Sequence, residues 1–144
     1  MAAQWFAVKT LYRSETVERP ENPDRFYDPD MTLLEERVLL IKASGRGEAL
    51  SKAEREARDY AAKTHCVNPY SQTVRTVYLG DCEIYELTGT PADKTEIFTT
   101  TRLISKRVPD HKIKHIYLGR HERAPAQSKR KKFINKNYSS GIGS

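Results

Sequence analysis

The sequence predicts an α+β fold in which a single, mostly antiparallel sheet of five to six strands carries one main helix. Segments rich in β-branched and aromatic residues recur along the chain, and turn-forming residues separate them. One further segment repeats small apolar residues at helical spacing. The predicted order is strand, strand, helix, strand, strand, strand, with a short sixth strand as an option.

The first two predicted strands cover residues 5–13 (WFAVKTLYR) and 35–43 (EERVLLIKA). Both place apolar side chains on both faces, which is typical of strands that are covered on both sides. One helix cannot shield both faces of such a sheet. We therefore expect the chain's own loops, a second copy or a different partner to cover the second face.

The predicted helix covers residues 47–64, where Ala49, Ala53 and Ala57 recur at four-residue spacing among charged residues. Small alanines allow a helix to lie close to a sheet. Ser44 is the expected N-cap, and Asn68-Pro69 lies just beyond the helix.

Strand-like segments follow the helix. Residues 73–79 and 82–87 predict a hairpin around Gly80-Asp81, with a type II′ turn. Residues 96–104 (EIFTTTRLI) predict a fifth strand, and residues 112–118 predict the short sixth one.

The length of 144 residues argues for one domain, which we place at residues 1–123. It includes a long acidic loop, residues 14–32, with six carboxylates and three prolines. Residues 124–144 are polar and basic, and predict a flexible tail. Residues 102–144 hold 12 Lys and Arg against 2 Asp and Glu, whereas residues 1–101 hold 13 against 17. An acidic body therefore carries a basic C-terminal extension.

Several classes of protein do not fit this composition. No run of apolar residues is long enough to cross a membrane, and the first residues do not have the pattern of a secretory signal. The two cysteines, Cys66 and Cys82, are too few for a disulfide scaffold, so we expect a reduced, cytoplasmic protein. We expect no cofactor and no metal, since His111 and His115 lack the glutamate of a zinc hydrolase motif.

Several segments together resemble an uncharacterised family of short bacterial proteins, domain of unknown function 4288, over about residues 5–104. They are Trp5-Phe6-Ala7-Val8-Lys9, the run from Glu35 to Ala43, Glu48-Ala49, the run from Asn68 to Val74, and the strand of residues 82–87. The resemblance implies a small bacterial α+β domain. It implies no activity and assigns no role to any residue.

Two groups of residues are candidates for binding. Phe26 and Tyr27 are adjacent aromatic residues in the polar loop, where they either anchor the loop on the body or contact a partner. In the tail, cations interleave with an aromatic side chain, as in segments that neutralise phosphates and stack on bases: Lys129, Arg130, Lys131, Lys132, Phe133 and Lys136. The same tail could bind an acidic protein or a membrane surface, fold back on the acidic residues 14–36, or only aid solubility.

These observations lead to two main hypotheses for the function, beside which an enzyme of unrecognised type stays a third. The first is a small, non-catalytic bacterial module that binds a protein partner, with an immunity or inhibitor role as one form; a homodimer through the second sheet face is the related option. The second is a nucleic-acid-associated protein that attaches through its basic tail. We expect no enzymatic activity, because the sequence contains no recognisable catalytic constellation.

Overall fold

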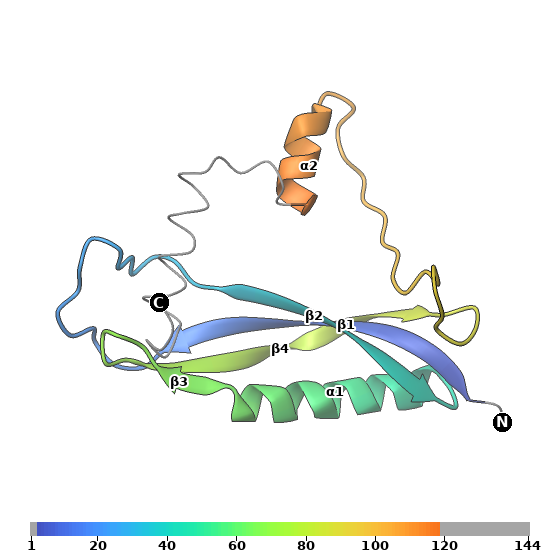
Figure 1. The fold of residues 1–144 in the computed structure, drawn as a ribbon, viewed down its shortest axis with the longest axis horizontal. Helices are drawn as coiled ribbons and strands as arrows, with labels where there is room; N and C mark the ends of the chain where they lie inside the picture. The colour runs from blue at the N-terminus through green and yellow to red at the C-terminus, as the bar shows by residue number, and fades with distance from the viewer. Residues whose placement is uncertain (1–2, 119–144) are drawn as a thin grey trace.

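The computed structural model describes residues 3–118 and confirms an α+β fold, with one curled antiparallel sheet and a helix along one of its faces (Figure 1). The sheet has four strands in the order β2-β1-β4-β3. In chain order the elements are β1 (Gln4–Thr16), β2 (Leu34–Ala43), α1 (Arg46–Lys63), β3 (His65–Val67), β4 (Thr73–Glu86) and α2 (Asp110–Leu118).

Strand β1 forms the centre of the sheet. It pairs with β2 on one side, without interruption from Gln4 opposite Ala43 to Arg13 opposite Leu34, and with β4 on the other side. Residues 5–13 carry apolar side chains on both faces, as a central strand does, whereas residues 35–43 share that pattern and form an edge strand. β3 adds only a short pairing at one end of β4, so β2 forms one whole edge of the sheet.

The alanine stripe of α1 packs against the sheet, as its spacing predicts. Ala49, Ala53 and Ala57 are fully buried, and the first two share a core with Phe6 and Val8 of β1. Because a methyl group is the only side chain between the helix and the sheet at these positions, the two backbones lie close together. The cluster that joins α1 to β1 and β2 therefore lies on one side of the sheet.

The start of α1 differs from the prediction. Gly45, not Ser44, is the N-cap residue, and it makes no side-chain cap. The hydroxyl and backbone N–H of Ser44 instead donate hydrogen bonds to the carboxylate of Glu48 in the first turn. A carboxylate at this position also faces the positive end of the helix dipole.

The predicted hairpin at Gly80-Asp81 is wrong, since residues 73–86 form one continuous strand. Thr10 lies opposite Cys82 and Tyr12 opposite Tyr78, so residues 79–81 bulge out opposite a single residue of β1. Gly80 has φ +84°, a value that favours glycine and that both a bulge and a tight turn can require. The long partner strand β1 decides between them, because it pairs with β4 on both sides of the bulge.

The two C-terminal strands are also wrong. The described sheet has four strands rather than five or six, because the two hairpin strands merge into β4 and the short strand β3 (His65–Val67), which the sequence reasoning missed, is added. Residues 96–104 have no regular structure. Phe98 packs on the sheet through its side chain, and the chain then leads away from the sheet towards α2 without pairing with a strand (Figure 1). Residues 112–118 belong to helix α2, which begins after Pro109 and has Asp110 in its first turn. Proline followed by an acidic residue is typical of a helix start.

The acidic loop is confirmed as a long connection, although β1 and β2 shorten it to residues 17–33. The predicted tail, residues 124–144, lies outside the described residues. Within residues 3–118, no helix has the length and apolar character needed to cross a membrane.

Candidate functional site

The face of the sheet opposite α1 carries exposed apolar side chains. Leu34, Val38 and Leu40 of β2 alternate with the residues that face the helix, and they are 63%, 43% and 45% exposed. We call this side of the sheet the open face. Exposed apolar groups that are contiguous on one surface mark contact sites more often than scattered ones do.

A chain segment covers part of the open face. The ring of Phe98 packs against that of Tyr85 on β4, with centroids 6.1 Å apart, and the ammonium of Lys9 lies 5.3 Å from the Phe98 ring centroid. Ala7, in the middle of β1, is fully buried. The chain's own segment therefore covers the second face around Lys9 and Tyr85, whereas Arg13 and Glu83 on the same face are exposed and β2 stays open.

Helix α2 lies on the side of the sheet away from α1 (Figure 1). None of its residues is buried, and Ile116, Tyr117 and Leu118 are all exposed. The strand interpretation of residues 112–118 missed this surface. Ile113, Ile116 and Tyr117 recur at three- and four-residue spacing, a helical signal in the sequence that could have identified it.

The loop aromatic residues lie elsewhere. Tyr27 packs edge-on against Tyr70. The guanidinium carbon of Arg25 lies over the Phe26 ring, 4.7 Å from the centroid of that ring. Both Phe26 and Tyr27 are half-buried. The loop is tied to the turn of residues 68–73 by backbone hydrogen bonds from Val17 to Thr73 and from Glu21 to Tyr70.

Glu18 fastens the same loop to β4. Its carboxylate accepts hydrogen bonds from the backbone N–H of Thr73 at 2.6 Å and from the Thr73 hydroxyl at 2.8 Å. These bonds lower the pKa of Glu18 below its usual value. Gln72, which is buried, also donates to the backbone oxygen of Glu18 at 2.8 Å.

The predicted nucleic-acid-binding residues lie outside the described residues: Lys129, Arg130, Lys131, Lys132, Phe133 and Lys136. Their positions relative to the open face therefore stay predictions.

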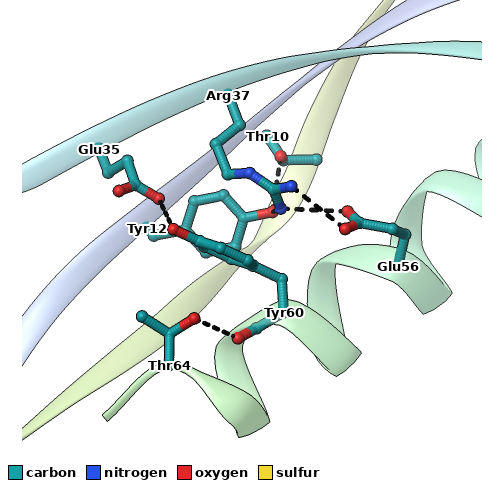
Figure 2. A network of polar contacts seen from close by, with 7 residues as sticks. All are labelled: Thr10, Tyr12, Glu35, Arg37, Glu56, Tyr60 and Thr64. Atoms are coloured by element: carbon teal, nitrogen blue, oxygen red, sulfur yellow. Dashed lines mark hydrogen bonds and ion pairs between the residues drawn. The ribbon is translucent and has the colours of Figure 1, made fainter. Parts of the chain in front are cut away.

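A polar network beneath β2 holds α1 to the sheet (Figure 2). The guanidinium of Arg37 donates to both carboxylate oxygens of Glu56, at 3.1 and 3.2 Å, and lies 3.6 Å from the ring centroid of Tyr60. It also donates to the hydroxyl of Tyr12, and Tyr60 donates to Glu35 at 2.6 Å. The bond to Glu35, together with burial, raises the pKa of Tyr60.

This network ties three elements of the fold together. Its arginine, glutamates and tyrosines resemble the residue types of an active site, but they bond to one another and join β1, β2 and α1. A bidentate arginine–carboxylate pair sets the orientation of both side chains. The network therefore explains why a helix with so narrow an apolar stripe stays aligned with the sheet.

Both cysteine thiols have a raised pKa. Burial raises the pKa of both the Cys66 and the Cys82 thiol, whereas a nucleophilic cysteine needs a lowered pKa. Burial and the neighbouring Cys82 also raise the pKa of Tyr78 to about 12. These groups stay protonated at neutral pH.

The histidines of α2 lie one helical turn apart. His111 and His115 are both exposed. Across residues 3–118, no three His, Cys, Asp or Glu side chains come close enough together to hold a metal ion.

A solvent-open groove of about 670 Å³ lies between the C-terminal half of α1 and β4, lined in part by Arg58 and Arg75. Each of these cations already lies close to a carboxylate, Glu54 at 4.0 Å and Glu15 at 3.9 Å. The groove therefore offers charges that are already paired, and the open face remains the better candidate for a binding surface.

Comparison with known proteins places the chain in a family but assigns no activity. The family described as "Domain of unknown function (DUF4288)" matches residues 5–99, which span β1, β2, α1, β3, β4 and the start of the following segment. No curated protein and no solved structure matches the chain. Since the match covers the whole sheet and the helix packed on it, the chain belongs to the DUF4288 family.

Proposed function

We propose that the protein is a small, non-catalytic interaction module of the bacterial cytoplasm that binds a protein partner through the open face. The observation that carries the proposal is the exposure of Leu34, Val38 and Leu40 along one strand of a sheet whose other face is packed. Apolar groups exposed in this way lose water when a partner covers them, and that loss is the main favourable term in protein association.

Helix α2 supports the same proposal. It lies on the same side of the sheet as the open face and exposes Ile116, Tyr117 and Leu118 (Figure 1). An apolar helix surface and an apolar strand surface on one side of a molecule suit a partner that contacts both. A partner enzyme or toxin that the module masks, as immunity and inhibitor proteins do, is the form of this function that we favour.

Affinity capture from a bacterial lysate tests the proposal, with and without nuclease. We expect wild-type protein to retain a stoichiometric, nuclease-resistant protein partner and Leu40→Lys to lose it. Leu50→Lys is the matched control, because Leu50 is an exposed leucine (38%) on α1, on the other side of the sheet. Equal retention by wild-type protein and both variants would place the contact away from the open face.

A second candidate function rests on charge. Residues 102–144 hold 12 Lys and Arg against 2 Asp and Glu, and Phe133 follows the run Lys129–Lys132. Binding to single-stranded nucleic acid should then weaken with salt, with a log–log slope of about −0.7 for each phosphate contacted. Deletion of residues 124–144 should abolish that binding; salt-insensitive binding that survives the deletion would contradict this function.

A further inference from the structure

We propose that two copies of this chain pair through β2, edge to edge, in an antiparallel dimer whose two-fold axis passes through Leu39. Strand β2 forms a complete edge of the sheet, and all of Leu34–Ala43 is paired on its inner side with β1. Among residues 3–118 no further strand pairs with its outer side, where the backbone oxygen of Lys42 accepts a hydrogen bond from Lys52. Such a strand edge is a template for a further strand.

The two edges of the sheet differ in the features that prevent pairing. The outer side of β4 is covered by β3 at residues 73–75, and the bulge at residues 79–81 with Gly80 at φ +84° interrupts it further on. Strand β2 contains no proline, and its register with β1 runs without a bulge. Proteins protect edges with bulges, prolines, short strands and charged side chains. Of these β2 has only the charged side chains, and two of them, Glu36 and Lys42, are of opposite sign and lie on the open face.

The sequence of β2 selects one register for the pairing. A two-fold axis perpendicular to the sheet keeps the open face of both copies on the same side, so opposed residues must belong to the same face. An axis through Leu39 meets this condition and places Val38 opposite Leu40 of the second copy. It also places Glu36 opposite Lys42 of the second copy, and symmetry repeats both pairs.

Neighbouring registers lack this charge complementarity. An axis through Val38 sets Lys42 opposite Leu34, and an axis through Leu40 sets Lys42 opposite Val38. An axis through Arg37 sets two guanidinium groups against each other. Since opposite charges across a strand pair stabilise it and like charges destabilise it, the axis through Leu39 is favoured.

The side chains at these positions can make the pairs. The Glu36 side chain is 57% exposed and lies 3.4 Å from Lys9 of its own chain, so the cation of the second copy would join an existing ion pair. Lys42 is also exposed. Its backbone oxygen accepts a hydrogen bond from the ammonium of Lys52 at 2.8 Å, which leaves the second lone pair of that carbonyl for the ladder.

The helices leave room for this arrangement. Helix α1 packs against Phe6 and Val8 of β1 and against Ile41 and Ala43 near the end of β2, and does not extend beyond that strand. With the axis at Leu39, the Ile41–Ala43 ends of the two β2 strands lie on opposite sides of the axis. The two β1 strands of a dimer would be three strand spacings apart, about 14 Å. Packed helices need only about 8–10 Å between their axes, so the two α1 helices would not clash.

The dimer would join two open faces into one continuous surface on an eight-stranded sheet. The backbone pairing runs along the strand edge, and the side-chain pairs beside it lie on the open face without covering it, so the dimer does not rest on the function proposed above. A dimer can form whether or not a separate protein partner binds.

Sedimentation equilibrium of the purified full chain over a range of concentrations tests the proposal. We expect wild-type protein to dimerise, and E36K and K42E each to weaken the association roughly tenfold to hundredfold, because each sets like charges opposite each other twice. A mixture of E36K with K42E should form mixed dimers. In these the two lysines of one chain, at positions 36 and 42, lie opposite the two glutamates of the other. The double variant E36K/K42E should dimerise as well.

The matched control is E83K, which makes the same charge change on β4, opposite Lys9 and away from the β2 edge. It should dimerise like the wild type. A wild-type protein that stays monomeric at every concentration would overturn the proposal, as would dimers unaffected by E36K and K42E. Failure of the mixture to restore dimers would overturn the register.

Discussion

Tyr27 packs edge-on against Tyr70, with ring centroids 5.3 Å apart and an interplanar angle of 71°. Tyr70 is buried, and its hydroxyl donates a hydrogen bond to Asp24 at 2.6 Å. Burial and this bond raise the pKa of Tyr70 well above its usual value. The sequence leaves two roles open for Tyr27, anchoring the loop on the body or contacting a partner. The contact with Tyr70 is of the kind that an anchor makes.

Tyr70→Phe should therefore loosen the loop of residues 17–33. The change keeps the ring but removes the hydroxyl, and the lost bond to Asp24 should lower the free energy of unfolding by about 1–2 kcal/mol. Proteolysis within the loop should become faster. Tyr117→Phe, the same change on the exposed surface of α2, should alter stability by less than about 0.5 kcal/mol. Urea denaturation that finds equal effects would mean that the hydroxyl of Tyr70 does not hold the loop.

Ala53→Asp tests which face of α1 packs on the sheet. Ala53 is fully buried against the core, so the new carboxylate would lose its water without gaining a partner, at a cost of about 3 kcal/mol or more. Arg55→Asp places the same carboxylate on the exposed side and should cost within about 0.5 kcal/mol. Thermal unfolding of both variants makes the comparison; similar losses would show that the helix packs on another face.

Gly80→Ala should destabilise the protein through its backbone alone. A Cβ at this position meets no atom within 4 Å, but the φ of +84° is strained for alanine, which should cost about 1 kcal/mol. Gly89→Ala is the matched control, because Gly89 also has free space around its Cβ position and no positive φ. If denaturation shows the same stability for both variants, the bulge does not need its glycine.

Glu48 should make stability depend on pH in acid. Hydrogen bonds from Ser44, followed by Lys52, lower the pKa of the Glu48 carboxyl from 4.5 to about 2. In the unfolded chain the group titrates near 4.5, so its contribution to stability is complete above that pH and is lost as the pH falls from 4.5 towards 2. Glu48→Gln should reduce the fall in unfolding free energy over this range and lower stability at pH 7. Glu96→Gln, on the exposed segment after β4, is the control for removing a carboxylate that lacks these hydrogen bonds. If the unfolding free energy of E48Q depends on pH as that of the wild type does, Glu48 does not cause the loss of stability in acid.

The central fold could be predicted from the sequence because its signals are local. The apolar residues of 5–13 and 35–43 predict two strands, and the spacing of Ala49, Ala53 and Ala57 predicts the buried side of the helix. The exposure of Val38 and Leu40 follows from the same reasoning, since one helix covers one face.

The remaining elements depend on partners that a local pattern does not contain. Glycine with positive φ suits both a hairpin turn and a bulge, and the length of β1 decides for the bulge. The β-branched residues of 96–104 favour a strand only where a neighbouring strand is available to pair with them. The network of Arg37 with Glu56 and Tyr60 joins residues far apart in the chain, so their proximity appears only in the folded structure.

Site-specific photo-crosslinking in living bacterial cells is the most direct test of the open face as a surface for a protein partner. A photoreactive amino acid at position 40 lies on that face, and the same amino acid at position 50 lies on α1, on the other side of the sheet. We predict a discrete crosslinked product at position 40 that contains a second, different protein by mass spectrometry, and no such product at position 50. Products that contain only two copies of this chain, or the same products at both positions, would contradict the claim that the open face binds a separate protein partner.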